Sequence, residues 1–343
     1  MGRKPKIVVT NPVFDETSRR LSALGELICN PSMEPWSRRE LLDHTRDAAA
    51  LMAFMTDFVD DDFLGHCPSL KVVAGALKGY DNLDADACTA RGIWLTVVPD
   101  LLTAPTAELA VALTLGLNRN LMMGDRFVRS GAFSGWRAQF YGLGLDGACV
   151  GIAGLGQVGI EIARRLQGFG CKLLGHDMRF DQHDALEQLQ IAPVNRENLL
   201  ARSDVLILAL PLNSHTFHWI DSVALQALRP GARLVNVGRG SVVDEEAVAV
   251  ALAMGSQDGR AEGTLAGYAA DVFAFEDWAR PDRPRCVSQA LLDMPDRTLF
   301  TPHLGSAVTV VRKAIEMAAV DNIEAAFLGK QPPGAVNVPD TQG

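Results

Sequence analysis

The 343-residue sequence predicts an α/β protein of two domains, the larger one built on a doubly wound parallel sheet. Short apolar runs rich in β-branched residues alternate with helix-like stretches along the whole chain. Alternation of this kind is typical of parallel sheets covered by helices on both faces. The length also favours two domains, because a single core seldom serves more than about 250–300 residues.

The composition excludes several classes of protein. Apolar residues make up 48% of the chain and charged residues 21%, which is ordinary for a globular protein and excludes dominant disorder. The 32 Lys and Arg residues against 41 Asp and Glu residues give a net charge of −9 without a basic block, so we expect neither nucleic acid nor a membrane surface as a partner. Six scattered cysteines without a CxxC pair indicate neither a metal site nor a disulfide framework, and the chain is predicted to be cytoplasmic.

The first hundred residues predict a first series of alternating elements. Strands are expected where short apolar runs occur, at residues 7–10, 51–54, 70–74 and 94–97. Helices are expected between them, at residues 16–24, 38–45, 60–66 and 84–91. The series ends at Val98-Pro99-Asp100, because Pro99 restricts the backbone of the residue before it.

A second series of elements begins after this break. A long amphipathic helix is predicted at residues 106–123. Six apolar runs follow it, the number of strands in one doubly wound domain. These runs lie at residues 148–153, 172–176, 204–210, 233–237, 267–272 and 298–301. The polar glycine-rich stretch at 255–263 predicts a surface loop.

A glycine-rich turn predicts where a dinucleotide binds. Gly154, Gly156 and Gly159 form a GxGxxG pattern between a predicted strand and a predicted helix. The first glycine permits the tight turn, the second lets the backbone approach a pyrophosphate, and the third lets the helix pack closely on the strand. Glycine-rich turns also serve plain packing, so the prediction gains from Asp177, eighteen residues past Gly159 at the end of the next strand.

Asp177 favours NAD as the cofactor. An acidic side chain at this position accepts hydrogen bonds from the ribose hydroxyls and repels the 2′-phosphate of NADP. Arg179 could lend some tolerance to NADP, although a solvated loop charge is its plainer interpretation. We therefore expect NAD, with NADP disfavoured rather than excluded.

Three polar residues lie just after the last three predicted strands. They are Arg239, Glu276 and His303. The carboxyl ends of parallel strands line the ligand crevice of an open sheet, so these side chains can converge. A guanidinium offers a planar fork to an oxyanion, and an imidazole oriented by a carboxylate accepts a proton near neutral pH. Each of them alone could be a surface charge or a turn residue, so the prediction of a catalytic site depends on all three together.

From Ile7 to about Asn337 the sequence resembles the D-isomer-specific 2-hydroxyacid dehydrogenases. The motifs that carry the resemblance are PTAELAVALTLGLNR, the GxGxxG turn, NVGRGSVVDE, AADVFAFE and TPHLGSA. The resemblance implies an NAD-dependent oxidoreductase whose catalytic triad is Arg239, Glu276 and His303. Further cofactor contacts are expected from Thr106, Gln157, Val158, Leu210, Pro211, Val237 and Asp271, besides Arg239 and His303.

The same resemblance implies a discontinuous fold. Residues 1–99 and 304–343 would form a smaller, flavodoxin-like substrate domain. Residues 100–303 would form a Rossmann-type NAD-binding domain. A homodimer is also implied, with the helix at 106–123 in its interface.

Four stretches resemble the phosphite-oxidising members of this family more closely. They are MAFMTDFVDDDFL, ALKGYDNLDADACTARGIWLTVVPDLLTAPTAELA, FVRSGAFSGWRAQFYGLGLD and DWARPDRPR. Lys78 stands where ordinary members look aliphatic, and a lysine beside Arg239 suits a dianion better than a monocarboxylate. This resemblance implies oxidation of phosphite to phosphate, with Lys78, Gly79, Arg239 and His303 binding the substrate. By the same resemblance, further site-lining residues are Met55, Leu102, Trp136, Tyr141 and Arg312. Core packing is an equally weighted alternative for Met55 and Leu102.

Two other functions stay open. A D-2-hydroxyacid dehydrogenase acting on glyoxylate-like or hydroxypyruvate-like acids would place Arg239 on the carboxylate and His303 on the hydroxyl proton. A non-enzymatic NADH-sensing corepressor would share the fold, but it needs a partner-docking motif that the sequence does not reveal.

The chain also departs from the family pattern in three places. Arg239 and Glu276 are 37 positions apart, which is longer than usual, and Ala274 stands where many relatives carry a glutamate. Residues 178–186 also diverge.

Overall fold

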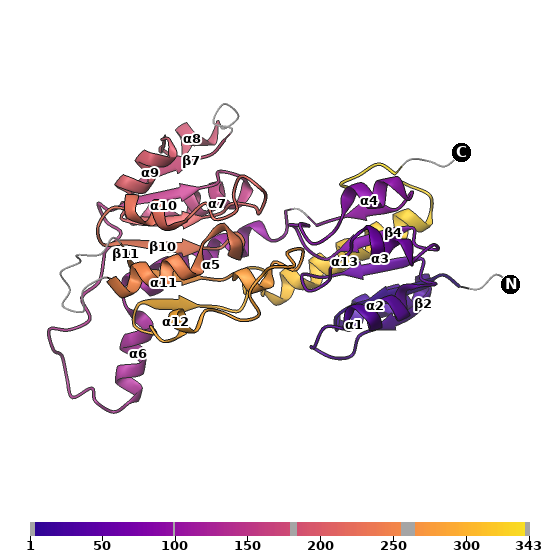
Figure 1. Cartoon of the computed structure of the whole chain (residues 1–343), viewed down its shortest axis with the longest axis horizontal. Coiled ribbons are helices and arrows are strands. Elements are labelled where there is room, and N and C mark those ends of the chain that lie inside the picture. The colour runs from indigo at the N-terminus through magenta and orange to yellow at the C-terminus, as the bar shows by residue number, and fades with distance from the viewer. Residues whose placement is uncertain (1–3, 99, 179–183, 255–264, 340–343) are drawn as a thin grey trace. The chain divides into compact units, whose positions relative to one another are not determined.

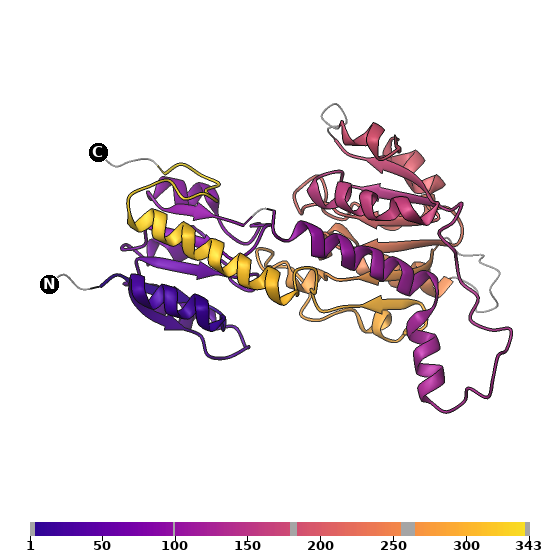
Figure 2. The same cartoon turned by 180° about the vertical axis from the view of Figure 1, so that it is seen from behind.

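The computed structural model describes residues 4–98, 100–178, 184–254 and 265–339. The chain forms two compact units, each built on a parallel sheet (Figures 1 and 2). The first unit comprises Met1–Leu102, Trp278–Pro281 and Ala307–Gly343, and the second comprises Thr103–Asp277 and Asp282–Ser306. The predicted fold class is confirmed. The assignment of one unit to the substrate and of the other to the cofactor remains a prediction.

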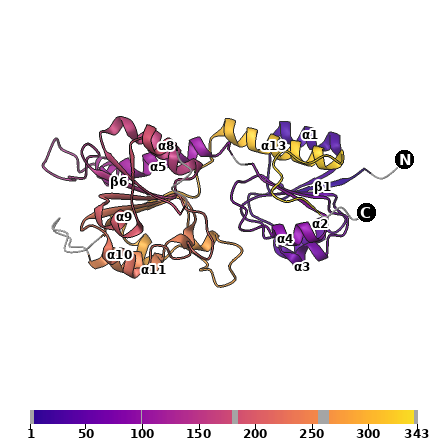
Figure 3. The same cartoon turned by 90° about the horizontal axis from the view of Figure 1, so that it is seen from above.

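The first unit has a five-stranded sheet in the order β2-β1-β3-β4-β5, the strand order of flavodoxin. Its central strands are buried on both faces, which explains why they are nearly continuous apolar runs. The strands are β1 (Lys6–Val9), β2 (Glu26–Cys29), β3 (Ala50–Ala53), β4 (Val72–Gly75) and β5 (Trp94–Thr96). One face carries α1 (Asp15–Leu24) and α13 (Thr309–Phe327), and the other carries α2 (Arg38–Thr45), α3 (Asp61–Gly65) and α4 (Ala85–Ala90) (Figure 3).

The second unit has a seven-stranded sheet in the order β12-β11-β10-β9-β6-β7-β8. Its strands are β6 (Cys149–Ala153), β7 (Lys172–His176), β8 (Ile191–Pro193), β9 (Val205–Leu208), β10 (Ala232–Asn236), β11 (Leu265–Ala270) and β12 (Thr298–Phe300). The chain order reverses between β6 and β9, and ligands bind open sheets at such a reversal, outside the carboxyl ends of the strands.

Helices cover both faces of this second sheet (Figure 3). One face carries α5 (Thr103–Asn118), α7 (Gln157–Leu166) and α8 (Ala185–Gln188), and the other carries α9 (Arg196–Arg202), α10 (Ser222–Ala227) and α11 (Glu245–Met254). The remaining elements are the helices α6 (Leu121–Arg129) and α12 (Gln289–Leu292) and the 3₁₀ turns η1 (Gln167–Phe169), η3 (Gly240–Val242) and η4 (Ala274–Glu276). Among the described residues, no helix combines the length and the apolar character needed to cross a membrane.

The structure differs from the predicted elements in two respects. The helix predicted at 106–123 is divided into α5 and α6, because Asn120 adopts a left-handed backbone with φ of 52° that interrupts a right-handed helix. Strands β2 and β8 were not predicted, because both are edge strands: β2 is only half-buried, and β8 contains Pro193, which only an edge position tolerates. The loop predicted at 255–263 and Arg179 lie outside the described residues.

Candidate active site

The glycine-rich turn joins β6 to α7 in the way the sequence predicts. Gly154 has φ of +90°, a conformation that side chains rarely permit. A Cβ added to Gly159 would lie 1.9 Å from the carbonyl oxygen of Gly154, so the helix is in backbone contact with the turn. A Cβ added to Gly156 would meet no protein atom within 4 Å. The second glycine therefore faces open space at the helix N-terminus, where the backbone fits a pyrophosphate.

Asp177 lies beside this turn. It directly follows β7, and its Oδ2 accepts a hydrogen bond from the backbone N–H of Leu155 at 2.7 Å. Gln157 and Val158 are the first two residues of α7, so they lie at the same end of the sheet. The structure thus brings together the predicted cofactor residues of the first βαβ segment.

Arg239 and the loop before it lie near the centre of the sheet. The loop follows β10, and the Asn236 side chain holds it by donating to the Arg239 carbonyl at 2.9 Å and accepting from the Gly238 N–H at 3.1 Å. A Cβ added to Gly238 would lie 2.4 Å from the carbonyl oxygen of Leu210, so the ends of β9 and β10 are in close contact. Val237 is buried and Pro211 is exposed at this junction. Four of the predicted residues are therefore neighbours here.

His303 and Glu276 form a hydrogen-bonded pair. The Nδ1 atom of His303 lies 2.8 Å from Oε2 of Glu276, and both side chains are partly exposed. His303 has a left-handed backbone with φ of 55°, and its N–H donates to the carbonyl of Asp271 at 2.9 Å. A non-glycine residue in this conformation is uncommon and is found at constrained sites. With Nδ1 engaged by Glu276, Nε2 is the ring nitrogen left to exchange a proton with a substrate.

Asp271 organises the backbone on which His303 sits. Its carboxylate accepts hydrogen bonds from Thr301 Oγ1 at 2.6 Å, from the Leu304 N–H at 2.6 Å and from the Gly305 N–H at 2.8 Å. Burial raises the pKa of Asp271, and these donors oppose the rise. A Cβ added to Gly305 would lie 3.1 Å from Oγ1 of Thr106, so α5 also reaches this point. The structure therefore places Asp271 behind the histidine, in a role the sequence did not predict.

Lys78 and Gly79 follow β4 in the first unit. Asn82, a little further along this loop, donates to the carbonyl oxygens of Phe54 at 3.2 Å and Asp57 at 2.6 Å. The loop of Lys78 is therefore tied to the loop of Met55. Burial lowers the pKa of the Lys78 ammonium, while the nearby Asp100 carboxylate raises it.

The other predicted substrate residues of the first unit make packing contacts. The Arg312 guanidinium on α13 lies 5.7 Å from the centre of the Phe54 ring, and burial lowers the pKa of Arg312. Leu102 and Met55 are partly buried and each packs against a hydrophobic core of this unit. These contacts support the core-packing alternative for Met55 and Leu102, and their substrate contact stays a prediction.

Trp136 and Tyr141 lie in the segment between α6 and β6. Their side chains are 79% and 78% exposed. Both aromatic side chains are therefore open to solvent in the single chain. Their predicted role at the substrate stays a prediction.

The sequence reasoning missed three buried polar residues near these loops. They are Asn82, Glu245 and Asp277. Glu245 is the last residue of the NVGRGSVVDE motif, and Asp277 directly follows the AADVFAFE motif. A motif alone does not reveal which of its side chains are buried. Within the described ranges, no group of three or more His, Cys, Asp and Glu residues has the arrangement of a metal site.

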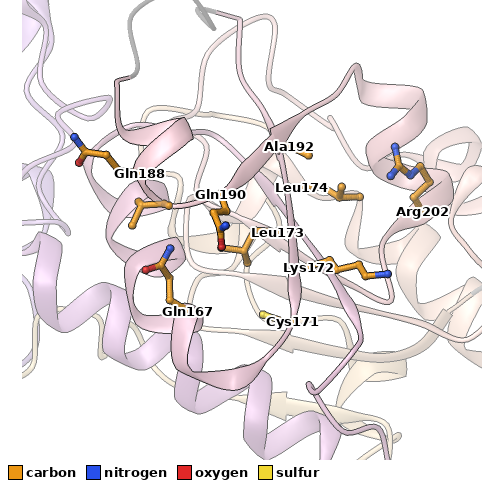
Figure 4. Close-up of a pocket in the computed structure, with 10 residues that line it drawn as sticks. Gln167, Cys171, Lys172, Leu173, Leu174, Gln188, Gln190, Ala192 and Arg202 are labelled. Atoms are coloured by element: carbon orange, nitrogen blue, oxygen red, sulfur yellow. The ribbon is translucent and has the colours of Figure 1, made fainter.

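A pocket of about 530 Å³ lies elsewhere in the second unit. Lys172 and Arg202 lie on one side of it and Gln167 and Gln188 on the other (Figure 4). Lys172 is the first residue of β7, so the pocket is at the amino ends of the strands. The predicted cofactor and catalytic residues follow the carboxyl ends, and none of them lines this pocket.

Comparisons with known proteins extend over nearly the whole chain. A model described as "D-isomer specific 2-hydroxyacid dehydrogenase, NAD binding domain" matches residues 111–305. A glyoxylate reductase of Thermococcus litoralis is 34% identical over 339 residues, which are 97% of each chain. The TT0316 protein of Thermus thermophilus has a TM-score of 0.86 and 30% identity, covering 97% of this chain and 100% of that one. An NADPH-dependent glyoxylate/hydroxypyruvate reductase of Sinorhizobium meliloti, solved with NADP and malonate, has a TM-score of 0.81, 30% identity and 97% coverage of both chains.

Proposed function

The chain belongs to the D-isomer specific 2-hydroxyacid dehydrogenase family. We propose that within this family it oxidises phosphite by hydride transfer to NAD, with His303 as the base. The observation that carries the hydride-transfer chemistry is the 2.8 Å contact between His303 Nδ1 and Glu276 Oε2, in the same unit as a turn that fits a dinucleotide, while the choice of phosphite as substrate depends on Lys78. This pair is a general base with an orienting carboxylate, the arrangement that a proton-coupled hydride transfer requires.

The residues have separable roles in this reaction. When bound, NAD accepts the hydride, so that phosphite, NAD and water give phosphate, NADH and a proton. Glu276 fixes the orientation of the His303 ring, and Nε2 takes the proton of the water that attacks phosphorus. The guanidinium of Arg239 binds substrate oxygens as a planar donor.

Lys78 favours phosphite over a monocarboxylate. Phosphite carries up to two negative charges near neutral pH, and two cations balance them better than Arg239 alone. Burial already disfavours the Lys78 ammonium, and a bound oxyanion would offset that penalty. We therefore assign Lys78, with the backbone of Gly79, to the substrate oxygens.

A second candidate is reduction of glyoxylate or hydroxypyruvate. The names of the relatives support this candidate more directly than they support phosphite, since the Thermococcus protein is named a glyoxylate reductase and the Sinorhizobium protein a glyoxylate/hydroxypyruvate reductase. The same side chains would serve it, with Arg239 on the carboxylate and His303 on the hydroxyl proton. The proposal that phosphite is the substrate depends on Lys78 and on the four stretches that resemble phosphite-oxidising members of the family.

Asp177 makes NAD the proposed cofactor. Its carboxylate lies at the turn, 2.7 Å from the Leu155 nitrogen, where a 2′-phosphate would meet a negative charge. The Sinorhizobium relative was solved with NADP, so the family accommodates either dinucleotide.

A homodimer is part of the proposal. The interface is predicted at residues 106–123. The end of this range, the rest of α6 and the segment after it expose Leu121, Met122, Val128, Trp136 and Tyr141. Exposed apolar residues in such number are typical of an interaction surface. Light scattering coupled to size-exclusion chromatography tests this point, and a monomeric mass at micromolar concentration would contradict it.

Initial rates with a panel of substrates test the function. NADH formation from NAD is measured with phosphite and with several D-2-hydroxy acids, and NADH consumption is measured with glyoxylate and hydroxypyruvate. Efficient turnover of phosphite alone supports the first candidate. Turnover of the organic acids alone leaves the family chemistry in place and replaces phosphite as the substrate.

A further inference from the structure

We propose that two buried carboxylates, Glu245 and Asp277, position Arg239 and Glu276 by tying together the two loops that carry them. Neither carboxylate is placed on the substrate or the cofactor, so both are positioning residues. The inference rests on the proposed function, because that function assigns Arg239 and Glu276 to the reaction.

The two loops follow neighbouring strands of the sheet. After β10 the chain passes through Arg239 and η3, and it reaches Glu245 at the first residue of α11. After β11 the chain passes through η4, whose last residue is Glu276, and then reaches Asp277. Each loop therefore carries one catalytic residue and is followed closely by one buried acid.

The acids bind the opposite loops reciprocally. Glu245 Oε1 accepts a hydrogen bond from the Ala274 N–H at 2.7 Å, and Asp277 Oδ2 accepts one from the Ser241 N–H at 2.7 Å. Ala274 is two residues before Glu276, and Ser241 is two residues after Arg239. Both hydrogen bonds thus act on backbone that directly supports a catalytic side chain.

The backbones of the two loops touch between these hydrogen bonds. A Cβ added to Gly240 would lie 1.8 Å from the carbonyl carbon of Phe273 and 2.1 Å from the nitrogen of Ala274. No side chain fits there, so glycine is required between Arg239 and Ser241. Hydrogen bonds on both sides of such a contact leave the loops little freedom to slide.

Burial makes the arrangement rigid. Glu245 is 7% exposed and Asp277 is 2% exposed, and Ser241 and Ala274 are buried as well. A buried N–H that loses its acceptor is strongly disfavoured, so the loops are held in one geometry. Burial also raises the pKa of Glu245 to about 7, against the effect of the Ala274 N–H, and Asp277 and Glu276 act in the same direction as burial. Glu245, Asp277 and the catalytic Glu276 therefore lie close enough for their charges to interact.

Matched substitutions separate hydrogen bonding from packing. Glu245→Gln and Asp277→Asn keep an oxygen that can accept from the backbone, whereas Glu245→Leu and Asp277→Leu remove it at similar size. Glu246→Leu is the control, because Glu246 is the exposed neighbour of Glu245. The readouts are kcat and KM for the substrate and for NAD, and hydrogen–deuterium exchange of the peptides spanning η3 and η4.

We expect each buried leucine variant to lower kcat at least about tenfold, since small displacements of catalytic groups reduce rates by one to two orders of magnitude. The KM for NAD should change by a smaller factor than kcat, because the glycine-rich turn that fits the pyrophosphate follows β6, and of the residues in these two loops only Val237, Arg239 and Asp271 are expected cofactor contacts. The amide and control variants should stay within about threefold of the wild type. The double leucine variant should lose less than the product of the two single losses, because both act on one contact.

Two results would overturn the inference. The first is that Glu245→Leu and Asp277→Leu both fold and keep a kcat within threefold of the wild type. The other is an equal loss in the leucine and amide variants, which would exclude the acceptor role. If the leucine variants do not fold, hydrogen–deuterium exchange of the wild type tests the inference. The backbone amides of Ser241 and Ala274 must then exchange slowly, and exchange as fast as in exposed loops contradicts the inference. The two proposals can also be told apart in the wild type. If it turns over none of the substrates while the peptides spanning η3 and η4 exchange slowly, the proposed function is refuted and the contact between the loops is supported.

Discussion

Glu245→Gln should stabilise the second unit at alkaline pH and lose this advantage in acid. Glu245 is buried, and burial raises the pKa of its carboxyl from 4.5 to about 7, with Asp277, Glu276 and Glu246 adding to the rise and the Ala274 N–H opposing it. A pKa that is higher in the folded state means that folding is favoured by the bound proton. This favourable contribution is complete below about pH 4.5 and is lost as the pH rises through about 7.

The magnitude follows from the size of the shift. A rise from 4.5 to about 7, at about 1.4 kcal/mol for each unit, corresponds to about 3 kcal/mol of unfolding free energy at pH 8. A change of 1 kcal/mol moves the thermal midpoint of a unit of this size by about 2–4 °C. Glu245→Gln should therefore raise the midpoint by about 6–12 °C at pH 8 and by little at pH 5.

Differential scanning calorimetry at the two pH values measures the effect. The transition of the second unit can be identified because NADH, which we expect to bind there, should shift it upward. Glu246→Gln is the control: this exposed side chain is the smallest contributor to the rise, so its substitution should shift the midpoint at pH 8 much less than Glu245→Gln does. A Glu245→Gln midpoint that is lower than the wild type at pH 8, or displaced by the same amount at pH 5 and pH 8, would refute the reasoning.

Three further substitutions test the site. His303→Asn should lower kcat about 100- to 10,000-fold, because it removes the proton acceptor; steady-state rates showing near-normal turnover would exclude His303 as the base. Lys78→Ala should raise the KM for phosphite about 10- to 100-fold through loss of a charged contact, and an unchanged KM would count against phosphite as the substrate. Asp177→Ser should reduce the preference for NAD over NADP at least about tenfold; an unchanged ratio of kcat/KM for the two dinucleotides would show that Asp177 does not exclude the 2′-phosphate.

The sequence by itself determined the fold class and the position of the cofactor turn. Both depend on local signals: apolar runs mark strands buried on both faces, and the glycines of GxGxxG are needed where a backbone turns sharply or is approached closely. It also predicted Arg239, Glu276 and His303, because residues that follow parallel strands must lie at one edge of the sheet. The sequence did not predict the edge strands β2 and β8, because partly exposed strands lack a continuous apolar run. It also did not predict the break at Asn120, because a single left-handed residue does not change the hydrophobic periodicity.

Only the tertiary structure decided which polar side chains turn inward. Glu245 and Asp277 read as ordinary surface acids in the sequence, yet each binds backbone 29 or 36 positions away. Asp271 was predicted only as a cofactor contact, and its three donors come from a segment 30 to 34 positions further along. Pairings of this kind depend on how β10, β11 and β12 lie beside one another, and neither periodicity nor spacing within one stretch contains that information. The physical reason is that a carboxylate can be buried only where hydrogen-bond donors satisfy it. Here those donors reach the carboxylate only when the sheet has formed.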